Sequence, residues 1–211
     1  LDEIGDESLS HDQRFKVLQM LMRMRQLSCH IGLVDDQWKG SSSKLDVLME
    51  QLEQLKERGN RPLIFSQFTS HLALIREACD KAGITYQYLD GQTTPPQRQQ
   101  RVEAFQAGES DAFLISLKAG GTGLNLTAAD YVIHMDPWWN PAVEDQASDR
   151  AHRIGQTRPV TVYRLVACET IEEKIVQLHH AKRDLADSLL EGTDTAGALT
   201  ADDLLNLLRT R

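Results

Sequence analysis

The middle of the chain alternates short apolar runs with amphipathic stretches, and this alternation predicts its secondary structure. Runs rich in β-branched and aromatic residues predict strands, at residues 62–68, 85–91, 111–117, 131–136 and 160–166. Between them, apolar residues recur at helical spacing, which predicts helices at residues 69–83, 94–108 and 141–153. Strands separated by helices of about 10–15 residues predict right-handed crossovers and a mainly parallel α/β sheet.

Turn and cap residues mark the ends of these helices. Thr94 stands where an N-cap belongs, Pro95 occupies the first turn, and Gly108 follows the last apolar position. Asn140 and Pro141 form the same cap-and-proline start before the third helix, which we expect to run to about residue 153.

The flanks of this alternating region are predicted to be helical. Residues 12–29 and 43–58 are amphipathic, and Ser43 with Asp46 is expected to cap the second of these helices. Thr170 and Glu173 have the spacing of a capping box, which predicts a long helix behind them. We therefore divide the chain into a helical lead-in (1–60), an α/β core (61–168), a long exit helix (169–191), and a linker with a short tail helix (192–211).

Composition narrows the class of protein. The net charge of −8 speaks against nucleic acid, yet residues 61–168 hold nearly equal numbers of basic and acidic residues, so a local basic patch remains possible. The 3 cysteines are far apart, which argues against a disulfide framework or a cysteine-type zinc site and favours a reducing compartment. The sequence contains neither a transmembrane run nor a signal peptide, and its start without Met leads us to expect a piece of a longer protein.

A glycine-rich segment follows one of the predicted strands. Ligands of parallel sheets bind at the carboxyl ends of strands, and Gly120, Gly121 and Gly123 follow the strand at 111–117. Backbone N–H groups of glycines can approach an anion closely, but a tight turn between strands explains the same residues. The segment lacks the lysine of a Walker A loop and is not a dinucleotide fingerprint.

Two tryptophans follow the next strand end, in the stretch DPWWNP. Trp138 and Trp139 could stack on bases, or they could pack the loop against a neighbouring element.

The stretch DQASDRAHRIGQTRP, residues 145–159, is rich in arginine. On a continuous helix Gln146, Arg150 and Arg153 would share one face, where planar guanidinium groups suit phosphate binding. The alternative is an ordinary surface ion pair between Asp149 and Arg153, worth about 0.3–0.5 kcal/mol.

Taken together, these segments resemble a known family. LIFSQF, YLDGQT, LISLKAGGTGLNLTAADYVIHMDPWWNP and QASDRAHRIGQTRPVTVYRLV occur in the order and spacing of the C-terminal RecA-like lobe of Swi/Snf-type ATPases in helicase superfamily two. RMRQLSCH, SSSKLDVLMEQL and ETIEEKI resemble the helices that enter and leave that lobe. The resemblance covers nearly the whole chain and implies a RecA-like, mainly parallel sheet with helices on both faces and flanking helices at each end.

The resemblance also implies roles for individual residues. Arg150 and Arg153 would reach the γ-phosphate of ATP as arginine fingers, which stabilise charge on the transferring phosphoryl group. The residues that it implies at the nucleotide are Gln146, Gly123 and Asn125. The residues that it implies at DNA are Ser66, Gln67, Ser116, Lys118, Gly120, Gly121, Thr122 and Trp139.

The implied activity is ATP-driven translocation on double-stranded DNA, used to remodel protein–DNA complexes. The sequence has no Walker A motif and no Asp-Glu-x-His-type metal motif, so ATP and Mg²⁺ are expected only in a two-lobe protein, with neither bound tightly by this chain alone. The expected partners are the N-terminal lobe of the same protein and DNA, not a membrane, in a bacterial cytoplasm and nucleoid, or a nucleus in a eukaryote. The alternative is a non-catalytic module that binds DNA or protein.

Overall fold

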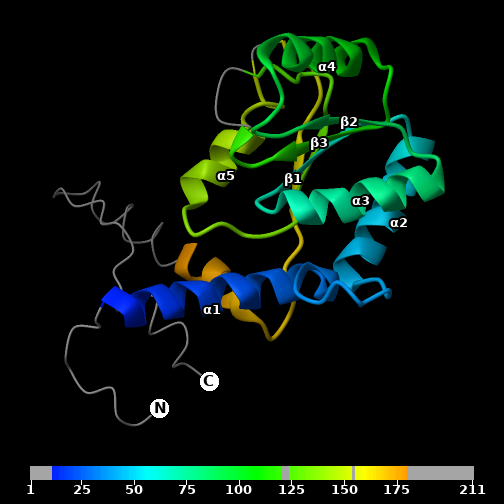
Figure 1. The fold of residues 1–211 in the computed structure, drawn as a ribbon. Helices are drawn as coiled ribbons and strands as arrows, with labels where there is room; N and C mark the ends of the chain where they lie inside the picture. The colour runs from blue at the N-terminus through cyan, green and yellow to red at the C-terminus, as the bar shows by residue number, and fades with distance from the viewer. Residues whose placement is uncertain (1–10, 120–123, 154, 180–211) are drawn as a thin grey trace, which may run out of the picture.

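The computed structural model describes residues 11–119, 124–153 and 155–179. Within them one parallel sheet has the strand order β2-β3-β1-β4-β5 (Figure 1). Its strands are β1 (Pro62–Ser66), β2 (Tyr86–Leu89), β3 (Ala112–Ser116), β4 (Tyr131–His134) and β5 (Thr161–Arg164). The helices are α1 (His11–Cys29), the 3-10 helix η1 (Ile31–Leu33), α2 (Ser43–Glu57), α3 (Thr69–Ala82), α4 (Pro95–Ala107), α5 (Pro141–Ser148) and residues 171–179. The predicted α/β class and parallel sheet are confirmed.

Successive residues of the central strand β1 enter opposite layers of the core. Leu63 and Phe65 point to one face of the sheet, where Phe105 of α4 and Ala147 of α5 pack against them. Side chains alternate along a strand, so the intervening Ile64 faces the other layer. Both faces of β1 are therefore apolar, as a central parallel strand requires.

The second layer of the core contains α2 and α3. Leu48 of α2, and Leu72 and Ile75 of α3, pack with Ile64 in one fully buried cluster. α2 is consequently an integral part of the α/β core, because its leucines fill the same layer as α3.

The helix ends follow the predicted cap chemistry with one shift. Gly83 and Gly108 end α3 and α4 in left-handed conformations, with φ of 65° and 85°, where a Cβ would be strained. The Gln97 side chain accepts from the Thr94 backbone N–H at 3.2 Å, as in a capping box. The expected cap at Ser43 is wrong by one residue, because the Ser42 hydroxyl accepts from Leu45 N at 3.3 Å.

The expectation of a helix from Pro141 to Arg153 is wrong at its end. α5 stops at Ser148, and the chain turns through tighter bonds, such as Arg150 N to Ala147 O at 3.3 Å. Ala151 N likewise donates three residues back, to Ser148 O at 3.1 Å, so the i−4 pattern of an α-helix is already lost here. A distant segment binds this turn, because Arg150 O accepts from Leu126 N at 3.1 Å. Arg150 and Arg153 do not lie on a shared helical face with Gln146.

α1 and the helix at residues 171–179 form an outer layer. α1 runs along one end of the molecule (Figure 1), and its Leu21 packs with Ile171 and Ile175. The predicted extension of the exit helix to residue 191, the linker and the tail helix lie outside the described residues. Among the helices that the structure describes, none is long and apolar enough to cross a bilayer.

The burial of α2 predicts a large cost for shortening Leu48. Leu48→Ala should lower the free energy of unfolding by about 2–5 kcal/mol, because it leaves a cavity in the core. Urea titration monitored by circular dichroism measures the effect. Val47→Ala is the matched control on the same helix: Val47 is 42% exposed, and its change should stay within about 0.5 kcal/mol. Equal small effects would mean that α2 is separable from the core.

Candidate functional site

The carboxyl ends of three neighbouring strands bring several predicted site residues together. Ser66 at the end of β1 is the register partner of Ser116 at the end of β3, and Leu117 N donates to Ser66 O at 2.9 Å. Lys118 follows and is exposed. Ser66, Ser116 and Lys118 therefore occupy one edge of the sheet, which is where this architecture places ligands.

Asp136, just after β4, is buried and binds several residues at this edge of the sheet. Its carboxylate accepts from the Ser66 hydroxyl at 2.5 Å and from Gln67 N at 3.1 Å, and it forms an ion pair with Arg25 at 3.5 Å. Burial raises the pKa of Asp136, while these hydrogen bonds and the nearby Arg25 and Lys44 oppose the rise. The Ser66 hydroxyl also accepts from Phe68 N, and its single donor is used on Asp136, so it has no proton left to donate to a phosphate.

The tryptophan loop, defined here as residues 136–140, packs around Arg25 of α1. The Arg25 guanidinium lies 5.0 Å from the Trp138 ring centroid, 5.5 Å from that of Trp139 and 5.2 Å from that of Phe68. Trp138 also packs against the sheet cluster, and Trp139 against the α1 cluster. Both tryptophans are half-buried, so packing accounts for part of each ring, including Trp139, which the sequence predicted to be at DNA.

Arg150 is buried without a neutralising partner. It is 2% exposed, and among the described residues its Nε and Nη1 atoms have no hydrogen-bond partner. Burial lowers the pKa of Arg150, and the positive charges of Arg153 and Arg98 lower it further. No carboxylate of the described residues offsets this charge, so an anion would stabilise the buried guanidinium.

The other residues predicted at the nucleotide differ from Arg150 in exposure. Arg153, Gln146 and Asn125 are exposed, whereas Arg98 of α4 is half-buried. The alternative ion pair between Asp149 and Arg153 does not occur among the salt bridges of the described chain. Gly120, Gly121, Thr122 and Gly123 lie outside the described residues, and the roles expected for them stay predictions.

Comparison with known proteins decides the family. Residues 43–155 match the family described as helicase conserved C-terminal domain. The chain belongs to this family. Its fold matches the C-terminal domain of a Sulfolobus solfataricus SWI2/SNF2 ATPase, with a TM-score of 0.73 and 28% identity over 96% of this chain and 85% of that one. The chain is thus the C-terminal RecA-like lobe of a Swi/Snf-type ATPase.

Two further comparisons relate the lobe to larger proteins. The Sulfolobus solfataricus SWI2/SNF2 ATPase core in complex with double-stranded DNA matches with a TM-score of 0.75 and 30% identity, over 97% of this chain and 42% of that one. A putative ATP-dependent helicase/translocase of Bacillus subtilis is 40% identical over 90% of this chain and 21% of its own length. The lobe therefore spans about a fifth of that relative.

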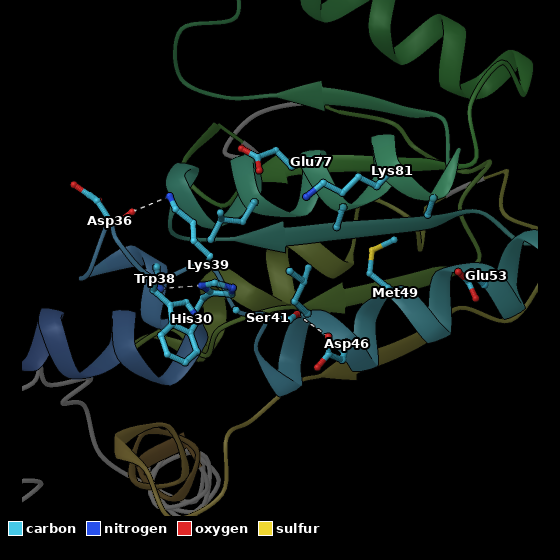
Figure 2. Close-up of a pocket in the computed structure, with 16 residues that line it drawn as sticks. His30, Asp36, Trp38, Lys39, Ser41, Asp46, Met49, Glu53, Glu77 and Lys81 are labelled. Atoms are coloured by element: carbon cyan, nitrogen blue, oxygen red, sulfur yellow. Dashed lines mark hydrogen bonds between the residues drawn. The ribbon is translucent and has the colours of Figure 1, made fainter.

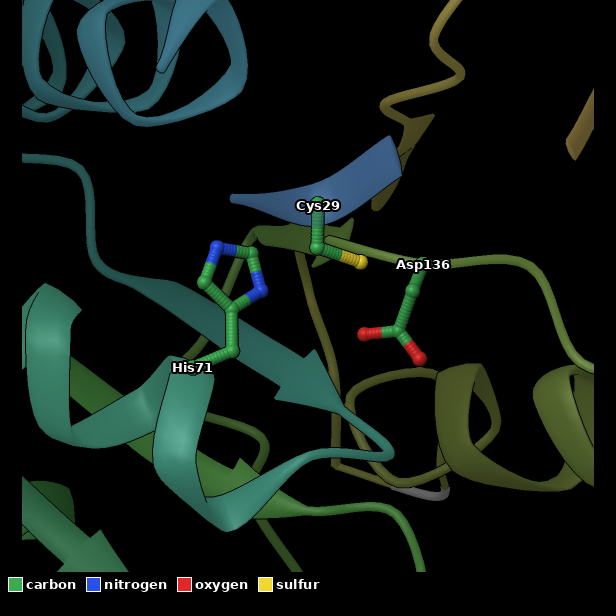
Figure 3. Close-up of side chains that lie close together, drawn as sticks. All are labelled: Cys29, His71 and Asp136. Carbon is green, nitrogen blue, oxygen red and sulfur yellow. The ribbon is translucent and has the colours of Figure 1, made fainter. Parts of the chain in front are cut away.

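One cluster of side chains in the lobe has the chemistry of metal ligands. Cys29, His71 and Asp136 are buried, and a ligand atom of each lies within 4.8 Å of the others (Figure 3). The cations Arg25 and Lys44 contribute to the field at these groups, and Asp136 already pairs with Arg25. A metal ion would add positive charge beside two cations, so the cluster does not suit one.

A further hollow on the lobe lies elsewhere. Its volume is about 700 Å³, and the loop after α1, α2 and α3 line it (Figure 2). Trp38 and Met49 contribute apolar surface, and residues of both charges, including Lys39 and Glu77, stand at its rim. None of the predicted nucleotide or DNA residues lines this pocket.

Sequence reasoning missed four residues of the site. Arg25 lies in a segment whose pattern predicts only a lead-in helix, and Arg98 lies in a glutamine-rich stretch without a motif. Asp136 and Glu144 are acidic residues to which the sequence assigns no role. A carboxylate directly after a strand that ends at a site was the available signal for Asp136, whereas nothing local distinguishes Glu144.

The buried His71 predicts acid sensitivity of the lobe. Burial, then the charges of Lys44 and His30, lowers the pKa of His71 to about 3, against about 6.5 in an unfolded chain. The unfolded state therefore binds a proton first, and stability is lost as pH falls below about 6.5. Between pH 7 and pH 5 the loss from this group should be about 2 kcal/mol.

Urea titrations of wild type and His71→Leu at both pH values test this prediction. His71→Leu should lose less stability on acidification, whereas the exposed His152→Asn should match wild type. An unchanged pH dependence in His71→Leu would contradict the assignment.

Proposed function

We propose that this chain is the second motor lobe of an ATP-dependent double-stranded DNA translocase, and that Arg150 and Arg153 act on ATP held by the first lobe. The observation that carries the proposal is the unneutralised charge at Arg150. Of the two fully buried arginines, Arg25 has an acidic partner and Arg150 has none among the described residues.

A phosphate from outside the lobe supplies the negative charge that balances Arg150. Burying a guanidinium beside Arg153 and Arg98 costs free energy, and a phosphate approaching from a second lobe offsets this cost with charge-assisted hydrogen bonds. Arginine suits this role because its planar group donates two parallel hydrogen bonds to phosphate oxygens. The exposed Arg153 reaches the same phosphate when the lobes close, and hydrolysis releases them.

The strand edge supports DNA binding of a sequence-independent kind. Ser116 and Lys118 stand at the end of β3 beside the end of β1, and a neutral or basic edge contacts backbone phosphates without reading bases. The similarity to a SWI2/SNF2 core in complex with double-stranded DNA supports this partner. Because the Ser66 hydroxyl is bound internally, Gln67 is the stronger candidate for contact from β1. The roles proposed for Gln146, Asn125 and the glycine-rich residues 120–123 rest on the sequence motifs.

ATP and Mg²⁺ belong to the first lobe in this proposal. The glycine-rich P-loop and the acidic metal residues that hold them in such motors are absent from this sequence. The lobe contributes transition-state stabilisation, DNA contacts and the closing motion, and the whole protein acts where DNA is, in a nucleoid or nucleus.

ATP hydrolysis by the full-length protein, with and without duplex DNA, tests the proposal. Arg153→Ala should lower kcat by about 10³-fold or more, the typical worth of an arginine finger. Arg150→Lys and Arg153→Lys should also lower kcat, because an ammonium cannot donate two parallel hydrogen bonds. Arg158→Lys is the matched control, since Arg158 pairs with Asp130 at 2.8 Å, and it should stay near wild type. Unchanged turnover in Arg153→Ala would refute the finger, and absence of DNA-stimulated hydrolysis in wild type would favour a non-catalytic binding module.

The isolated 211-residue chain should hydrolyse ATP no faster than a buffer blank. The physical reason is that the groups that hold the phosphates and Mg²⁺ lie on another lobe. A sensitive phosphate-release assay with duplex DNA measures this, and adding the first lobe in trans should restore turnover. Robust turnover by the chain alone would contradict the division of the site between two lobes.

A further inference from the structure

We propose that Arg25 of α1 is a positioning residue that sets the place of Arg150 through the tryptophan loop and α5. This inference rests on the proposed function, because it concerns how the arginine site is held ready for phosphate. It assigns a role in catalysis to a helix outside the sheet, and to a residue that touches neither nucleotide nor DNA.

The first step is the way Arg25 is held. The residue is 1% exposed and lies against the rings of Phe68, Trp138 and Trp139, at 5.0–5.5 Å from their centroids. Its Nη2 donates to Pro137 O at 3.0 Å. Among the described residues its Nε and Nη1 make no hydrogen bond, so the aromatic faces fix the plane of the guanidinium. Arg25 in turn fixes the orientation of both tryptophans.

The second step joins the tryptophan loop to α5. The backbone N–H of Trp138 donates to Glu144 Oε1 at 2.7 Å, and Arg164 Nε of β5 donates to Glu144 Oε2 at 2.7 Å. Glu144 is fully buried in α5. A shift of the loop therefore shifts α5, or leaves a buried carboxylate without its donor.

The third step joins α5 to Arg150. Arg150 follows the last turn of α5, and its N–H donates to Ala147 O at 3.3 Å. Ala147 and Ala151 on either side are buried in the sheet cluster. The direction of the Arg150 guanidinium is thus determined by where α5 sits.

The outer helices keep Arg25 itself in place. Lys44 Nζ of α2 pairs with Glu172 at 2.5 Å and donates to Met135 O at 2.7 Å. Cys29 Sγ at the end of α1 lies 3.6 Å from Glu172, and the His179 ring contacts Trp138 O. α1, the helix at residues 171–179 and the tryptophan loop are linked, so movement of the flanking helices reaches the arginine site.

The test uses the full-length protein with Arg25→Met combined with Asp136→Asn. The pair of changes removes the ion pair without leaving one buried charge alone, which keeps the fold accessible. We expect DNA-stimulated kcat to fall about 10–100-fold, the typical cost of misplacing a catalytic group by about 1 Å. The comparison is made at saturating DNA, because Asp136 also accepts from Gln67 N beside the proposed DNA contacts, so kcat and not the KM for DNA reports the positioning role. Arg23→Met, on the exposed side of α1, is the matched control and should keep wild-type kcat.

A mutant cycle with Arg150→Ala separates positioning from general damage. If Arg25 acts through Arg150, the double change at residues 25 and 136 should lower kcat little further in the Arg150→Ala background. An equal fold-loss in both backgrounds would overturn the proposal.

If the double change does not fold, Arg25→Lys is the deciding variant, because lysine keeps the charge but not the planar group. A folded Arg25→Lys protein with wild-type kcat overturns the proposal, and a lowered kcat supports it. Absence of DNA-stimulated hydrolysis in wild type overturns the proposed function and this inference together, whereas retained kcat in the variants overturns the positioning role alone.

Discussion

The ion pair between Asp136 and Arg25 is the interaction on which this lobe depends most. A carboxylate buried at the end of a central strand needs donors, and the sheet itself supplies only the Ser66 hydroxyl and the Gln67 N–H. The balancing positive charge comes from α1, which precedes the sheet in sequence and lies outside it (Figure 1). The outer helix layer is therefore linked by an ion pair to the edge of the sheet that holds the proposed DNA contacts.

The two buried arginines of the described chain differ in how their positive charges are balanced. Arg25 lies against aromatic rings and pairs with a carboxylate, so its charge is balanced within the fold. Arg150 lies near two other arginines and has no acidic partner in the described chain. A fold tolerates such an imbalance when a ligand supplies the missing charge, and in the proposed function that ligand is a phosphate held by another lobe.

Local sequence chemistry predicted the elements well and one helix end badly. The ends of α3 and α4 followed from glycines that adopt positive φ, and the starts of α4 and α5 followed from cap residues with proline behind them. Each of these signals acts within a few residues, so it can be read from the sequence. α5 ended early, and the chain turns through bonds to carbonyls three residues back while Arg150 O accepts from the distant Leu126 N; helical periodicity contains no information about such a tertiary bond.

The candidate site, like the secondary structure, could be predicted only in part from the sequence. The sequence by itself determined the family and the parallel sheet and made Arg150 and Arg153 candidates, because the motifs and the strand–helix alternation are local and ordered along the chain. Only the tertiary structure decided that Arg150 is buried and unneutralised while Arg153 is exposed, and that the Ser66 hydroxyl faces Asp136. It alone joined Arg25 to Trp138, residues 113 positions apart in the sequence. The physical reason is that burial and charge balance depend on which distant groups meet in space, and folding alone brings them together.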